Sequence, residues 1–120
     1  MDIGEIDPSM WRGGEVRATA PANEVRFNRR ELDRILSLYG RMVAAGEWRD
    51  YAIDFLKDRA VFSIFRHASQ VPIYRVEKNP KLSRRQGAYS VVSATGLILR
   101  RGHELDPVLS VLDRVLRVVS

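Results

Sequence analysis

The chain has 120 residues, of which 45% are hydrophobic and 29% charged, and it contains no cysteine. This length and composition predict one globular domain and exclude disulfides, thiolate catalysis and Cys-based metal centres. No apolar run is long enough to cross a bilayer, and the N-terminus lacks the order of a secretory signal. We therefore expect a cytoplasmic protein without a membrane segment.

The positive charge is concentrated in the middle of the chain. The formal net charge is +5, but ten bases face only two acids between Lys57 and Arg101, whereas residues 1–25 hold five acids and two Arg. Of the 20 bases, 17 are Arg, a residue suited to bidentate contacts with phosphate or carboxylate. A GC-rich genome would produce the same bias. The basic segment could attract a polyanion, or it could hold the acidic N-terminal segment loosely.

In chain order, residues 1–25 come first and read as a mobile tail, because Gly and Pro interrupt every periodic pattern there. Trp11 is the one large aromatic residue of this tail. It is a candidate anchor for a partner, or it folds back to bury its ring on its own domain. Residues 26–120 are predicted to form one domain.

The first helix is predicted to begin at Asn28, because Glu31 three residues later completes a capping box. Apolar residues at three-and-four spacing run from Leu32 to Val43, and Gly46 supplies a stop. We expect this stripe to face the core.

Five strands are predicted to follow. Residues 50–55 alternate apolar and polar side chains, and residues 60–66 are apolar on both faces, which indicates a strand buried on both sides. Further short strands are predicted at 73–77, 88–93 and 97–101, the last two as a hairpin. The short connections favour an antiparallel meander.

The last helix is predicted from Asp106 as the cap and Pro107 at the first helical position. Its apolar surface, which continues to Val119, is broader than one sheet face needs, so a homodimer through this C-terminal helix or the tail could cover the remainder. The predicted fold class is α+β, a five-stranded antiparallel meander flanked by an N-terminal and a C-terminal helix.

Six stretches of the chain match a known family: residues 27–32 (Phe-Asn-Arg-Arg-Glu-Leu), 39–54, 58–63, 76–82, 86–92 and 101–105 (Arg-Gly-His-Glu-Leu). Through these stretches the chain, from Phe27 to Val119, resembles a small alphaproteobacterial family known only as a domain of unknown function, numbered twenty-seven ninety-four. The resemblance implies no activity, cofactor or catalytic residue.

Catalytic signatures are scarce in the sequence. There is no nucleophile elbow, phosphate loop or dinucleotide fingerprint. The two histidines, His67 and His103, are 36 residues apart without the spacing of paired metal ligands, so we expect no metal and no cofactor. His103 and Glu104 are the only acid–base candidates, and the sequence favours a local connector at this position over a catalytic role.

The sequence therefore favours a binding or regulatory module over an enzyme. Its basic residues are predicted to converge at one end of the sheet and to engage nucleic acid or an acidic protein, with Tyr74 and Tyr89 as stacking platforms. Two alternatives stay open: a small-ligand binder or acid–base enzyme centred on His103 and Glu104, and a structural subunit of an assembly. The candidate anion-binding residues are Lys78, Lys81, Arg84, Arg85, Arg100 and Arg101.

Overall fold

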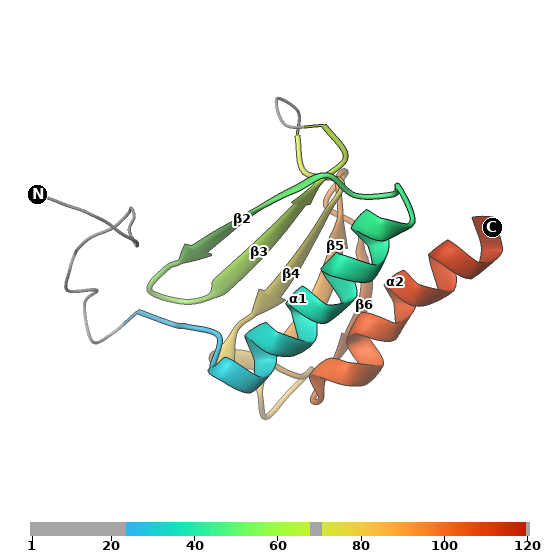
Figure 1. The fold of residues 1–120 in the computed structure, drawn as a ribbon. Helices are drawn as coiled ribbons and strands as arrows, with labels where there is room; N and C mark the ends of the chain where they lie inside the picture. Colours follow the sequence, from blue (N-terminus) through green and yellow to red (C-terminus); the bar gives the residue numbers. More distant parts are fainter. Residues whose placement is uncertain (1–23, 68–70, 120) are drawn as a thin grey trace, which may run out of the picture.

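The computed structural model describes residues 24–67 and 71–119, and it describes side chains as far as residue 113. Two helices flank five strands, which confirms the predicted α+β fold class (Figure 1). In chain order the elements are α1 (Arg29–Ala44), β2 (Asp50–Phe55), β3 (Ala60–Phe65), β4 (Tyr74–Lys78), the short 3-10 helix η1 (Pro80–Leu82), β5 (Tyr89–Ser93), β6 (Ile98–Gly102) and α2 (Leu105–Val119).

The strands form one antiparallel sheet in the order β2-β3-β4-β5-β6, which is the meander that the short connections predict. The register places Ile53, Phe62, Val76 and Val91 in one row across the first four strands, on one face. Between β5 and β6 the register shifts at Val91 and Val92, so this pair contains an irregularity typical of a β-bulge.

Both helices lie on one face of the sheet, side by side (Figure 1). Arg34 Nε donates to Asp106 at 2.7 Å, and Arg41 donates to both oxygens of Asp113 at 3.0 and 3.1 Å. Each pair joins residues 72 positions apart, so both helices advance by the same two turns from one pair to the next. The helices are therefore parallel, and their N-termini meet at the same end of the sheet.

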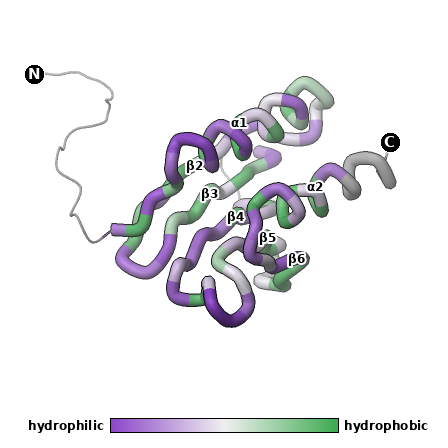
Figure 2. Tube along the Cα trace, turned by 90° about the horizontal axis from the view of Figure 1, so that it is seen from below, coloured by the Kyte–Doolittle hydropathy of each residue, from purple (hydrophilic) through white to green (hydrophobic). Residues whose placement is uncertain are grey.

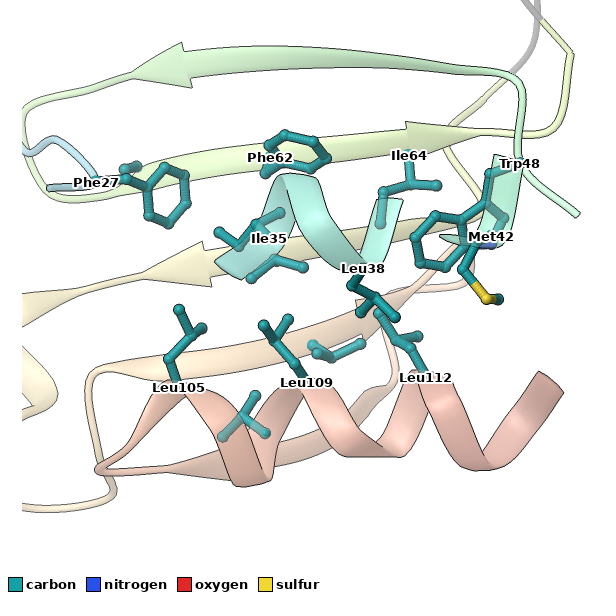
Figure 3. Close-up of a cluster of buried hydrophobic side chains, with 14 residues drawn as sticks. Phe27, Ile35, Leu38, Met42, Trp48, Phe62, Ile64, Leu105, Leu109 and Leu112 are labelled. Atoms are coloured by element: carbon teal, nitrogen blue, oxygen red, sulfur yellow. The ribbon is translucent and has the colours of Figure 1, made fainter. Parts of the chain in front are cut away.

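The core lies between the two helices and the sheet (Figure 3). Phe62 and Leu112 are fully buried there, and Trp48 is also buried, between Tyr39 and Tyr74 at ring distances of 6.2 and 6.4 Å. This placement explains why an apolar stripe is required on each helix. The labelled side chains of Figure 3 are Phe27, Ile35, Leu38, Met42, Trp48, Phe62, Ile64, Leu105, Leu109 and Leu112.

The opposite face of the sheet is covered by no helix among the described residues, yet β3 is buried on both sides as predicted. On that face Glu77 accepts hydrogen bonds from Arg59 at 3.0 Å and from Arg75 at 3.2 Å. Val61, the register partner of Glu77, is 8% exposed beside this network. These ion-paired side chains thus cover the face of the sheet that has none of the described helices on it.

The predicted elements differ from the observed ones mainly at their ends. Helix α2 begins at Leu105, so the predictions of Asp106 as its cap and of Pro107 as its first helical residue are wrong. Asp106 lies in the first turn, where its carboxylate still interacts favourably with the helix dipole and pairs with Arg34. At α1 the predicted capping box of Asn28 and Glu31 is present, with both hydrogen bonds at 2.8 Å.

No helix within the described residues has both the length and the apolar character needed to span a membrane.

Candidate functional site

A pocket of about 450 Å³ opens where the N-termini of the two helices meet. Helix α1 contributes Arg30, Glu31 and Arg34, preceded by the cap Asn28, and residues 103–106 contribute the opposite wall. Tyr89, the first residue of β5, also lines the pocket. Only Leu105 among these residues is apolar, so the pocket suits a polar ligand.

The pocket is built on the buried carboxylate of Glu31, which is 7% exposed. One oxygen accepts from Lys78 Nζ and from the amide of Asn28, each at 2.8 Å, and the other accepts from the hydroxyl of Tyr89. Lys78 also donates to the carbonyl of Arg26 at 2.9 Å. These bonds attach the start of α1 to β4 and β5, and they leave Glu31 with its hydrogen-bonding needs met.

The pKa values of this network follow from burial and from its bonds. Burial raises the pKa of Glu31, but the hydrogen bonds from Lys78, Tyr89 and Asn28 and the charge of Lys78 outweigh it and hold the pKa below its ordinary 4.5. Burial, reinforced by the hydrogen bond to Glu31 and its charge, raises the pKa of Tyr89 to about 12. At neutral pH the carboxylate is therefore ionised and the phenol keeps its proton.

Two of the three acids that line the pocket are already neutralised. Glu31 is paired with Lys78, and Asp106 is paired with Arg34. The remaining charged side chains are Arg30 and Glu104, which form no ion pair within the described part of the chain, and His103 is exposed beside them. The first-turn amides of two helices add positive potential at this point, because they have no intrahelical acceptors.

A family model matches more than half of the chain. Residues 25–109 match the model described as "Protein of unknown function (DUF2794)". The chain belongs to the DUF2794 family. No curated protein and no solved structure matches the chain. Every residue that lines the pocket lies inside the matched range of this DUF2794 chain.

The structure places His103 and Glu104 together in this pocket of the DUF2794 chain, both exposed. They follow the end of β6 and precede α2, where the sequence predicted a connector. Among the described residues no group of three His, Asp or Glu side chains could hold a metal ion. Arg30, His103 and Glu104 supply hydrogen bonding and charge at this site.

The predicted basic cluster is brought together only in part. Lys81, Arg84 and Arg85 are exposed on the loop between β4 and β5, which is mostly hydrophilic in Figure 2. Arg101 lies next to this loop, because its guanidinium donates to the side chain of Gln86. The pKa of Asp58 is lowered, first by its hydrogen bond with Arg59 and more weakly by the charge of Lys81, so the loop also lies near the turn between β2 and β3.

Two of the six candidate anion-binding residues, Lys78 and Arg100, do not lie with the others. Lys78 points into the ion pair with Glu31, and only 18% of its side chain is exposed. Arg100 is half-buried and aligns with Val91, on the other face of the sheet from its neighbour Arg101. The sequence could not reveal the first departure, because the partner of Lys78 lies 47 residues away.

The two candidate stacking residues are far apart. Tyr89 pairs with Lys78 at one end of β4, whereas Tyr74 pairs with Ser93 at the other end. Tyr74 packs near Trp48, and the hydroxyl of Tyr89 is bonded to Glu31. The pair does not form one platform.

The remaining sequence-based candidates lie outside what the structure describes. Trp11 is outside the described residues, and so are the side chains beyond residue 113 on which a homodimer through the C-terminal helix would depend. Conversely, Arg30 and Arg34 line the pocket although no sequence pattern predicted it. Their position in the first turns of a capped helix was the available signal, but the second helix that completes the pocket was not predictable from it.

Proposed function

We propose that this chain is a binding module that holds a small polar anion in the pocket between the N-termini of α1 and α2. The observation that carries the proposal is the pocket itself: its volume of about 450 Å³ falls in the range of small-molecule sites, and Arg30 and His103 line it. The paired acids Glu31 and Asp106 do not oppose an anion there. This proposal develops the small-ligand alternative centred on His103 and Glu104.

The proposal is tested by titrating the protein with inorganic phosphate at constant ionic strength in a calorimeter. We expect saturable binding at millimolar concentration or below, weakened at least fivefold in Arg30→Ala, because a charge-assisted hydrogen bond is lost. Arg29→Ala is the matched control, since Arg29 is exposed in the same helical turn but does not line the pocket. Absence of saturable binding, or an equal loss in both variants, contradicts the proposal.

A second candidate function is supported by the loop between β4 and β5. Lys81, Arg84 and Arg85 are exposed within five residues, and no ion pair of the described residues involves them. We infer that this loop can contact the phosphates of a nucleic acid. Such contacts depend steeply on salt, because each one releases a counterion.

An electrophoretic mobility shift at two salt concentrations tests this second candidate. We expect binding at low salt that is lost in the Arg84→Ala, Arg85→Ala double variant. The double variant Arg49→Ala, Arg66→Ala removes the same charge from exposed residues at the opposite end of the sheet and serves as the control. No shift at micromolar protein in low salt, or equal weakening by both double variants, rejects it.

A further inference from the structure

Tyr89 lines the pocket, and its hydroxyl group is already engaged as a hydrogen-bond donor. A phenol hydroxyl donates one hydrogen bond and accepts through its lone pairs, and here the hydroxyl of Tyr89 donates its hydrogen bond to Glu31. The pKa of Tyr89, raised to about 12 by burial and by Glu31, keeps that proton in place at neutral pH. Toward the pocket, the Tyr89 oxygen can therefore offer only an acceptor.

Glu104 offers a second acceptor. Its side chain is exposed, and it forms no ion pair within the described part of the chain. An ionised carboxylate accepts hydrogen bonds and donates none. The pocket thus combines donors at Arg30 and His103 with acceptors at Tyr89 and Glu104.

A phosphate or carboxylate group engages the donors Arg30 and His103 but leaves the acceptors Tyr89 and Glu104 largely unused. The pocket volume of about 450 Å³ lies within the usual range for small-molecule sites and leaves room for more than one phosphate group. The single apolar residue, Leu105, also argues against a long alkyl or aromatic ligand. A ligand that fills the pocket must bring hydroxyl donors together with its anionic group.

We infer that the ligand is a small hydroxylated anion, whose phosphate or carboxylate group binds Arg30 and His103 while its hydroxyl groups donate to Tyr89 and Glu104. This inference rests on the proposed function and specifies the class of ligand. An analogue without hydroxyls displaces water from the pocket and offers Tyr89 and Glu104 no donor in return, so it binds more weakly.

The inference is tested with two ligands of equal length, glycerol 3-phosphate and n-propyl phosphate, titrated in parallel with inorganic phosphate. In the wild-type protein we expect glycerol 3-phosphate to bind at least tenfold more tightly than propyl phosphate. D-Glycerate, which has hydroxyls on a carboxylate, distinguishes the two headgroups: the tighter of glycerate and glycerol phosphate identifies the anionic group.

Variants then assign the preference to residues. Glu104→Ala is expected to reduce the ratio of the two phosphate affinities to threefold or less, whereas Asp33→Ala, which removes an exposed acid of α1 outside the pocket, leaves the ratio unchanged. The ratio is the readout because loss of a negative charge strengthens the binding of every anion. Tyr89→Phe is expected to lower the ratio as well, with its folding checked by thermal unfolding.

Failure of the inference about hydroxyl groups and failure of the proposed function give different results. If glycerol 3-phosphate and propyl phosphate bind equally, the inference about hydroxyl groups is overturned while anion binding stands. If inorganic phosphate shows no saturable binding, the proposed function itself is overturned.

Discussion

Lys78 and Glu31 form an ion pair of 2.8 Å between the central strand of the sheet and the first turn of α1. Their side chains are only 18% and 9% exposed, and the same carboxylate accepts a hydrogen bond from the hydroxyl of Tyr89. The pair places a charged side chain, which the sequence assigned to an external partner, inside the protein. Glu31 also lines the candidate pocket, so its carboxylate contributes both to stability and to the shape of the site.

Removal of this carboxylate is expected to destabilise the protein strongly. Glu31→Ala leaves the ammonium group of Lys78 and the hydroxyl of Tyr89 without their acceptor, and we expect a loss of about 3 kcal/mol in the free energy of unfolding. Urea denaturation measures it. The comparison is Arg41→Ala, whose pair with Asp113 is exposed on the arginine side and should contribute about 0–1 kcal/mol. Similar losses of stability in the two variants would show that the buried pair of Glu31 contributes no more than the exposed pair of Arg41.

The raised pKa of Tyr89 predicts a loss of stability in alkali. The unfolded chain releases this proton near pH 10, whereas the folded protein holds it until about pH 12, so the contribution is complete below pH 10 and disappears between those values. After allowance for solvent screening we expect it to amount to no more than about 2 kcal/mol. Unfolding followed from pH 8 to 12 should show a steeper decline for the wild type than for Tyr89→Phe, and parallel curves would refute the assignment.

Two glycines should respond to alanine in opposite directions. Gly87 has a φ of +103°, and an added Cβ would lie 2.1 Å from the carbonyl carbon of Gly102, so Gly87→Ala is expected to cost about 3 kcal/mol or more. Gly40 lies within α1 with open space at its Cβ, so Gly40→Ala should gain about 1 kcal/mol. Thermal unfolding of both variants decides this. A stabilising Gly87→Ala would mean that the loop approaches β6 less closely.

The core prediction concerns Phe62, which is fully buried and stacks on Tyr51 at a ring distance of 4.9 Å. Phe62→Ala is expected to cost about 3–5 kcal/mol, through lost burial and the cavity left behind. Leu97→Ala is the control, because Leu97 is 63% exposed and its truncation should change stability by less than about 0.5 kcal/mol. Chemical denaturation provides both values, and a cost below about 1 kcal/mol for Phe62→Ala would contradict the position of the core.

The order of the elements was predictable because its causes are local. Alternating residues at 50–55 define a half-buried strand, the capping box of Asn28 and Glu31 defines a helix start, and short connections force neighbouring strands to be antiparallel. Element ends were less predictable. Asp106 is an acceptable cap by residue type, but the helix begins at Leu105, two residues before the predicted first helical position at Pro107, and Leu105 itself is buried in the core.

The pocket and the fate of the cations were decided by tertiary structure. The sequence grouped His103 with Glu104, but the parallel packing of α1 and α2 set Arg30 and Arg34 opposite them, 69 or more positions away in the chain. The same packing buries Lys78 against Glu31 and leaves Lys81, Arg84 and Arg85 exposed, although all four side chains are basic. The chain by itself specified which side chains are charged and which segments fold as helix or strand. Which charges meet depends on how the helices lie on the sheet, and that arrangement is fixed by burial of the whole core rather than by any local pattern.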